Sequence, residues 1–142
     1  MILHPDNICF LLARTEQRHY QYTKDLLARR NIPVTPGQLS ILCTLFEGDG
    51  IGMTELSRKS HFDNSTITGL VDKLERDGFL VRSNVPGDRR AYNISLTEKS
   101  LELRTALQEV SHFVAQEMLK GCSAEEIAHF RKVLINIFHR LK

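Results

Sequence analysis

Near residue 79, the hydrophobic pattern of this 142-residue chain changes from the period of a helix to that of a strand. Before this point, apolar residues recur at helical spacing over several segments. After it, Tyr92, Ile94 and Leu96 alternate with polar residues, as in a half-buried strand. Successive helices followed at once by a short hairpin predict a helix-turn-helix with a β-wing.

Three helices are predicted between residues 35 and 78. The first begins with Thr35 as N-cap, Pro36 at the first helical position and Gln38 three residues after the cap. Thr54 is expected to cap a short second helix over residues 55–60. Either Asp63 or Asn64 caps the third, over residues 65–77. Its expected buried stripe is Ile67, Leu70, Val71 and Leu74.

A hairpin with a basic tip is predicted directly after these helices. Its expected strands are residues 79–83 and 92–96, and the turn signal is Pro86–Gly87. The connection between the strands carries Arg89 and Arg90. We therefore expect two cations at the end of the wing.

Long amphipathic helices are predicted on both sides of this unit. Residues 6–30 form the first, residues 98–121 the second after a Thr97 cap, and residues after Ser123 the last. The predicted fold is mainly α with a small β-wing. It forms a single domain over residues 1–142, with a winged helix-turn-helix at about 35–97.

Composition narrows the class of protein. Nineteen Lys and Arg against 17 Asp and Glu give a net charge of +2, which neither requires nor excludes nucleic acid. No apolar run approaches the roughly 20 residues of a membrane span, and the N-terminus lacks the pattern of a secretory signal. Cys9, Cys43 and Cys122 form no Cys-x-x-Cys pair. We therefore expect a protein of the reducing cytoplasm.

No pattern of catalysis or metal binding stands out in the sequence. There is no nucleophile elbow or phosphate-binding glycine loop, and the six histidines include no His-x3-His pair. Asp72 and Glu75 lie three residues apart on a predicted helix, where we expect a solvated face. We accordingly expect a protein that is not an enzyme and binds no metal or cofactor.

Short polar side chains at the start of the helix before the wing suggest a DNA-reading surface. An α-helix fits the major groove, and the free amides of its first turn favour phosphate. Lys73 lies further along and can reach the backbone, whereas Arg89 and Arg90 suit the narrow minor groove. Residues 53–96 contain seven basic and six acidic side chains, which gives this segment a net charge of +1. The candidate groove-reading residues are Asn64, Ser65, Thr66 and Thr68.

Three stretches, residues 54–57, 65–80 and 88–97, resemble the MarR family of bacterial and archaeal transcription regulators. The most specific match is in the wing, where the family has Asp, any residue, Arg, five residues and Leu-Thr. The matching positions are Asp88, Arg90, Leu96 and Thr97. The resemblance covers nearly the whole chain and implies a sequence-specific regulator, here expected to be a repressor released by a small molecule.

The resemblance also implies a homodimer on a pseudo-palindromic operator in double-stranded DNA. Residues 6–30 and 98–142 would form the dimerisation helices; the alternative is that the first helix covers the last within one subunit. Asp88 belongs to the wing set, where we expect it to orient the wing rather than touch DNA. Many members carry Arg where this chain has Gly69, and a mid-helix glycine suggests a close approach there.

The family resemblance suggests two kinds of signal. Small aromatic or phenolic effectors would bind near Arg18, His19, Tyr20 and Tyr22. Alternatively, Cys9 resembles the cysteine of organic-hydroperoxide sensors, although the tyrosines of those sensors are replaced here by Ala13, Pro36 and Leu39. The alternative is a purely structural role, in which the three cysteines are small buried apolar residues. A different class, a winged helix that binds protein and no DNA, also fits the pattern.

Overall fold

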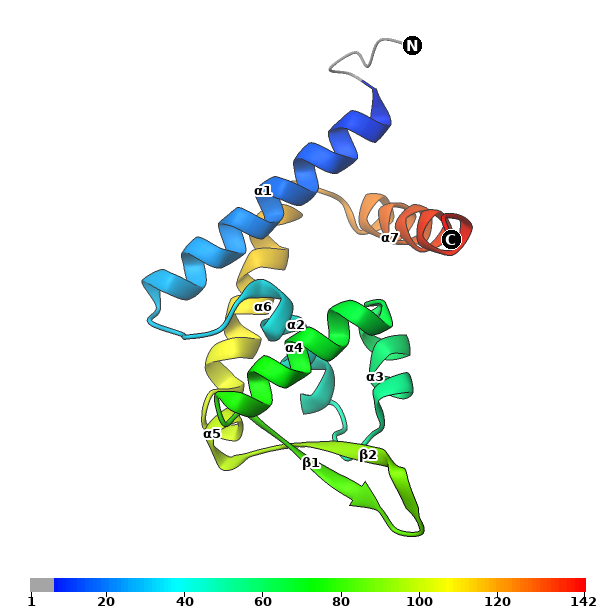
Figure 1. The fold of residues 1–142 in the computed structure, drawn as a ribbon. Coiled ribbons are helices and arrows are strands. Elements are labelled where there is room, and N and C mark those ends of the chain that lie inside the picture. Colours follow the sequence, from blue (N-terminus) through cyan, green and yellow to red (C-terminus); the bar gives the residue numbers. More distant parts are fainter. Residues whose placement is uncertain (1–6) are drawn as a thin grey trace.

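The computed structural model describes residues 7–142, so Asp6, the first residue of the predicted N-terminal helix, lies outside the described residues. Helices and one antiparallel hairpin make up the fold, as predicted (Figure 1). In chain order the elements are α1 (Ile8–Arg29), α2 (Pro36–Phe46), α3 (Met53–Ser60), α4 (Asn64–Arg76), β1 (Leu80–Val85), β2 (Asp88–Leu96), α5 (Glu98–Glu102), α6 (Arg104–Met118) and α7 (Ala124–Arg140).

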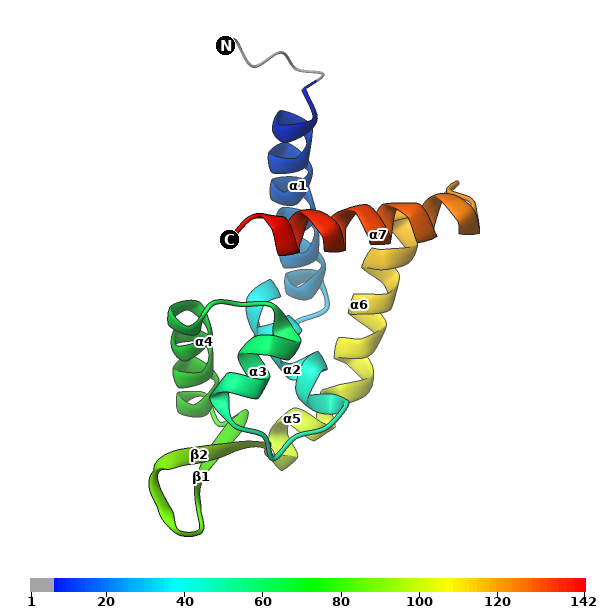
Figure 2. The same ribbon diagram turned by 90° about the vertical axis from the view of Figure 1, so that its right-hand side faces the viewer.

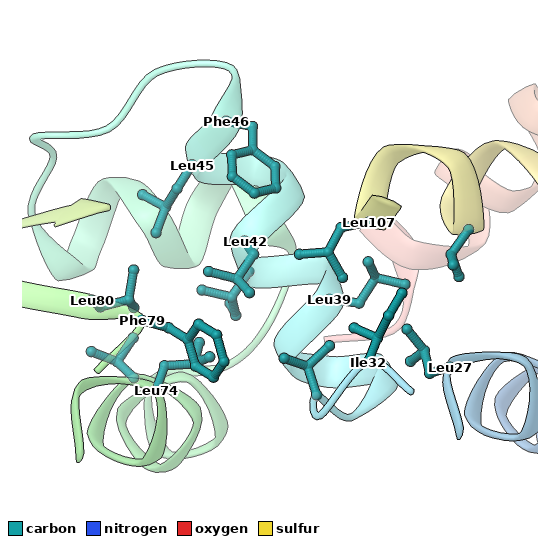
Figure 3. Close-up of a cluster of buried hydrophobic side chains, with 14 of the residues drawn as sticks. Leu27, Ile32, Leu39, Leu42, Leu45, Phe46, Leu74, Phe79, Leu80 and Leu107 are labelled. Atoms are coloured by element: carbon teal, nitrogen blue, oxygen red, sulfur yellow. The ribbon is translucent and has the colours of Figure 1, made fainter. Parts of the chain in front are cut away.

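The core is centred on α2, which packs against α1, α3, α4, α6 and β2. Ile41 and Leu42 of this helix are fully buried. Figure 3 shows α2 between two groups of side chains, with Leu74 and Phe79 on one side and Leu27 and Leu107 on the other. The helix begins as predicted: Thr35 Oγ1 accepts the Gln38 N–H, and Gln38 Oε1 accepts the Thr35 N–H.

Two helix boundaries differ from the predictions. Thr54 is not a cap, because α3 already starts at Met53 after Gly52, without a side-chain cap. The predicted helix over residues 98–121 is interrupted at Leu103, which separates α5 from α6. Thr97 is the N-cap residue of α5 as predicted, and Ser100 Oγ accepts its backbone N–H at 3.0 Å, while the Thr97 hydroxyl donates to the Gly78 carbonyl. Neither glycine nor proline marks the interruption, so composition alone did not indicate it.

The strands extend further toward the turn than predicted. Leu80 pairs with Leu96 and Asn84 with Tyr92, but Val85 pairs with Asp88. The register therefore shifts, and residues 89–91 of β2 form a bulge without partners on β1. Only Pro86 and Gly87 remain as the turn, with Gly87 at φ 84°.

The C-terminal helix α7 lies apart from the core (Figures 1 and 2). None of its residues is buried, so the alternative that α1 covers it within one subunit is wrong. Near its end, Phe138 packs edge-on against His61 in the turn between α3 and α4, with ring centroids 4.9 Å apart. No helix of the described residues is long and apolar enough to cross a membrane.

Candidate nucleic-acid interface

The start of α4 is fixed by Asp63, which settles the choice between the two cap candidates. Its Oδ1 accepts the backbone N–H of Thr66 at 2.7 Å and the Ser65 hydroxyl at 3.1 Å. These bonds, those of Thr66 foremost, hold the pKa of Asp63 below its ordinary value. The carboxylate therefore occupies part of the helix N-terminus, where we had expected free amides to favour phosphate.

The outward face of α4 carries short polar side chains. The exposed residues are Asn64, Ser65, Thr66 and Thr68. The Thr68 hydroxyl donates to the Asn64 carbonyl at 2.7 Å, as the Ser65 hydroxyl does to Asp63. Because both protons are used within the chain, the lone pairs of these hydroxyls are left as acceptors. Base amino groups in a major groove are suitable donors for them.

The arginine pair lies in the bulge of β2, rather than in a loop as predicted. Arg89 and Arg90 are exposed and have no strand partner. Asp88 Oδ1 accepts the backbone N–H of Arg90 at 2.9 Å. Asp88 therefore acts on the local backbone, as expected, and shapes the segment that presents the two guanidinium groups.

Helix α4 and the hairpin lie on the same side of the molecule, away from α6 (Figure 2). Lys73 is exposed further along α4. The helix with Lys73 and the hairpin with the arginine pair are therefore exposed on one side of the molecule.

A charged cluster, which we call the Arg82 cluster, joins β1 to α4. The Arg82 guanidinium binds the Asp72 carboxylate, and Arg82 Nε lies 4.0 Å from Glu75 Oε2. The same Glu75 oxygen accepts the Arg82 backbone N–H at 3.2 Å. Asp72 and Glu75 remain solvent-exposed as expected, with 57% and 38% of their side chains accessible, but they also bind Arg82, which was not predicted. The alternation of a strand places Arg82 on the face of buried Leu80, and this signal was available in the sequence.

Gly69 has open space around it, so no contact within the described chain requires a glycine at this position. A Cβ atom at Gly69 would meet nothing within 4 Å. We expect Gly69→Ala to raise the free energy of unfolding by about 1 kcal/mol, because alanine loses less backbone entropy in a helix. Urea denaturation measures this difference. Gly37→Ala is the contrasting variant and should gain less, since its Cβ would lie 3.2 Å from Leu70 Cδ2. This account would be contradicted if Gly69→Ala lowered the free energy of unfolding, or raised it by no more than Gly37→Ala does.

The residues predicted to bind an effector border cavities beside α1. Arg18, His19 and Tyr22 line a cavity of about 330 Å³ together with Glu117 and Met118 of α6. Small-molecule sites commonly measure about 300–1,000 Å³. No sequence pattern indicates the α6 residues, because their position depends on how α6 packs against α1.

A second cavity, of about 540 Å³, adjoins the first. It shares His19 with the first cavity and is also bordered by Tyr20 and Cys43. All four residues expected to bind an effector thus line one cavity or the other.

The three cysteines have different surroundings. Cys9 and Cys122 are exposed, so the alternative that all three are buried is wrong for these two. Burial, with the charge of Glu47 as the smaller cause, raises the pKa of Cys43 to about 11. Its thiol therefore stays protonated at neutral pH and is a poor nucleophile. Within residues 7–142, no three His, Cys, Asp or Glu side chains are grouped to hold a metal ion.

A helix-turn-helix followed by a wing defines a winged helix-turn-helix protein of the DNA-binding class. Residues 34–92 match the model of the MarR family. The HTH-type transcriptional repressor YetL of Bacillus subtilis is 36% identical over 112 residues, which are 76% of this chain and 66% of YetL. The repressor IacR of Pseudomonas putida is 27% identical over 133 residues, 94% of this chain and 78% of IacR.

A solved structure agrees over nearly the whole length. CouR from Rhodococcus jostii RHA1, bound to p-coumaroyl-CoA, superposes with a TM-score of 0.78 at 27% identity, over 94% of this chain and 92% of that one. The chain belongs to the MarR family. It is a DNA-binding transcriptional regulator, as the resemblance in its sequence predicted.

Proposed function

We propose that the protein is a homodimeric repressor that binds a pseudo-palindromic operator in double-stranded DNA and dissociates when a small aromatic or phenolic molecule binds. In each subunit, α4 enters the major groove and the hairpin reaches the adjacent minor groove. We call the winged helix-turn-helix of one subunit a head. Two heads in a dimer suit half-sites about 34 Å apart, which is one turn of DNA. We place this activity in the cytoplasm, without catalysis and without a cofactor.

The position of α4 and of the hairpin with its arginine pair on one side of the molecule carries this proposal (Figure 2). Ser65 and Thr68 offer acceptors to base edges, while Arg89 and Arg90 are free of ion pairs with described residues. The net charge of +1 over residues 53–96 makes one head a weak polyanion binder. High affinity therefore requires two heads on one DNA.

Unpartnered apolar surface on the flanking helices supports the dimer. Monomeric proteins rarely expose contiguous apolar patches of more than a few hundred Å². Residues 6–30 and 98–142 remain our assignment of the dimerisation helices. Large apolar side chains at least 36% exposed are Ile8, Leu11 and Leu12 of α1, Phe113 and Met118 of α6, and Phe130, Val133, Leu134, Ile135 and Phe138 of α7.

A mobility-shift assay tests the DNA-binding part of the proposal. The probe is the region upstream of the protein's own gene, at about 50 and 200 mM salt. We expect a shift at nanomolar protein that weakens at the higher salt. A different outcome is that the protein retards neither this region nor genomic fragments selected with it. The interpretation as a winged helix that binds protein would then replace the interpretation as a repressor.

The cavity beside α1 suggests how an effector is recognised. Arg18 supplies a cation for a carboxylate, and Tyr22 and Met118 supply apolar contacts for a ring. We expect salicylate to release the wild type from DNA, and Arg18→Ala to require at least about tenfold more salicylate because a charge-assisted bond is lost. Lys24→Ala, which removes a cation of α1 that borders neither cavity, is the matched control. Equal sensitivity of both variants would contradict the assignment.

Exposed Cys9 supports a second release mechanism, oxidation by an organic hydroperoxide. The same assay with cumene hydroperoxide distinguishes the two. Release of the wild type but not of Cys9→Ser would favour the thiol sensor. Release of both, or of neither, would exclude Cys9 as the sensor.

A further inference from the structure

We infer that Arg82 is the positioning residue that fixes the wing against α4, so that Arg89 and Arg90 are held beside the helix that reads DNA. The inference rests on the proposed function and adds a residue that itself need not touch DNA. It is carried by the Arg82 cluster, in which one guanidinium and one backbone N–H of β1 engage two carboxylates of α4.

The cluster lies where the hairpin leaves the body of the protein. Arg82 pairs in register with Ile94, which is buried and bonded through its backbone to Ile51 and Gly50 at 2.7 and 2.8 Å. Beyond this pair, strand residues 83–93 pair only with one another. Among the described residues, the Arg82 cluster is the outermost polar contact between the hairpin and the helices. The tip that carries the arginine pair therefore extends from this point.

The form of the cluster suits a positioning role. Asp72 and Glu75 are three residues apart, so they lie one above the other on α4 and span nearly one turn. The Arg82 side chain is 26% exposed, whereas those of Asp72 and Glu75 are 57% and 38% exposed, so solvent screens the cluster in part and its geometry matters more than its strength. A planar guanidinium fixes direction as well as distance, which the point charge of lysine does not. Rotation of the strand about its own axis would break the contact.

The cluster also governs the charge of the reading face. Asp72 follows Ser65 by seven residues, close to two helical turns, so both lie on the outward side of α4. An unpaired carboxylate there would repel phosphate. Loss of Arg82 can therefore weaken DNA binding in two ways, by freeing the wing or by exposing this charge, and the experiment must separate them.

Hydrogen–deuterium exchange of the free protein tests the positioning claim without DNA. We expect Arg82→Gln to increase exchange over residues 83–93 while α2 stays protected. Arg76→Gln, which removes an equal charge from α4 outside the cluster, should leave the hairpin unchanged. Arg82→Lys is the milder second variant and should change exchange less, in the same direction. Unchanged exchange of the hairpin in both Arg82 variants would overturn the inference.

A double-mutant cycle on operator DNA then asks whether Arg82 acts through the wing. We expect Arg82→Gln to weaken binding about tenfold in the wild type, the scale of a lost charged hydrogen bond. In an Arg89→Ala/Arg90→Ala background, most of that loss should disappear. An equal loss in both backgrounds would overturn the inference and assign the effect to repulsion by Asp72. Absence of DNA binding by the wild type would overturn the proposed function instead, because the exchange result is independent of it.

Discussion

Replacing Leu134 with glutamate is expected to convert the protein into a monomer and to remove most of its affinity for DNA. Leu134 lies on α7, 36% exposed, within the apolar surface that no other part of the described chain covers. A buried, unpaired carboxylate at a dimer interface is strongly unfavourable. A single head retains half of the DNA contacts, so we expect binding to fall on the order of a thousandfold or more.

Analytical ultracentrifugation measures the mass, and the mobility shift measures the affinity. Asn136→Glu introduces the same charge two residues away on the same helix. Asn136 is polar and exposed, and we expect this variant to stay dimeric and to bind normally. A Leu134→Glu variant that sediments as a dimer would show that α7 faces solvent in the assembly. The exposed apolar surface would then need another explanation.

Removing both wing arginines is expected to weaken operator binding strongly and to flatten its dependence on salt. Each phosphate contact contributes about 0.9 to the slope of log K against log salt, so the four arginines of a dimer contribute at most about 3.6. Arg89→Ala/Arg90→Ala should therefore lose affinity most at low salt. Titrations at several salt concentrations give both the affinity and the slope.

The control for the wing variant removes two cations elsewhere in the same head. Arg58 and Lys59 of α3 both lie near Glu55, at 4.0 and 3.4 Å, so their charges are partly compensated. Arg58→Ala/Lys59→Ala should change the slope less than the wing variant. A wing variant with an unaltered slope would mean that Arg89 and Arg90 contact no phosphate.

Local signals were sufficient to predict most of the fold. Thr35 with Gln38 forms the expected cap, and the last helix begins after Ser123 as expected, where Ser123 Oγ accepts the Glu126 N–H, because capping depends on residues within one turn. The interruption at Leu103 escaped prediction because helical apolar spacing continues across it. A break without glycine or proline depends on packing, which a sequence pattern does not report.

The candidate site was predictable where single elements define it. The short polar residues of α4 and the arginine pair were identified from the sequence and are exposed on two elements, α4 and the hairpin, that lie on one side of the structure. The Arg82 cluster was missed because it depends on the contact between a strand and a helix. The pattern of α4 alone places Asp72 and Glu75 on its exposed face, but it does not indicate that a strand residue binds them. The bulge of β2 was missed for a similar reason, since register depends on both strands.

The open space at Gly69 has a consequence for how regulators of this kind diversify. A Cβ atom added there would meet no atom of the described chain within 4 Å, and the neighbouring residue Thr68 is exposed. Substitutions on this face therefore leave the buried stripe of α4 intact. Recognition of a new operator can therefore evolve at these positions without disturbing the packing of the core. On α4, the exposed residues that would choose the DNA target are thus different from the buried residues that hold the fold together.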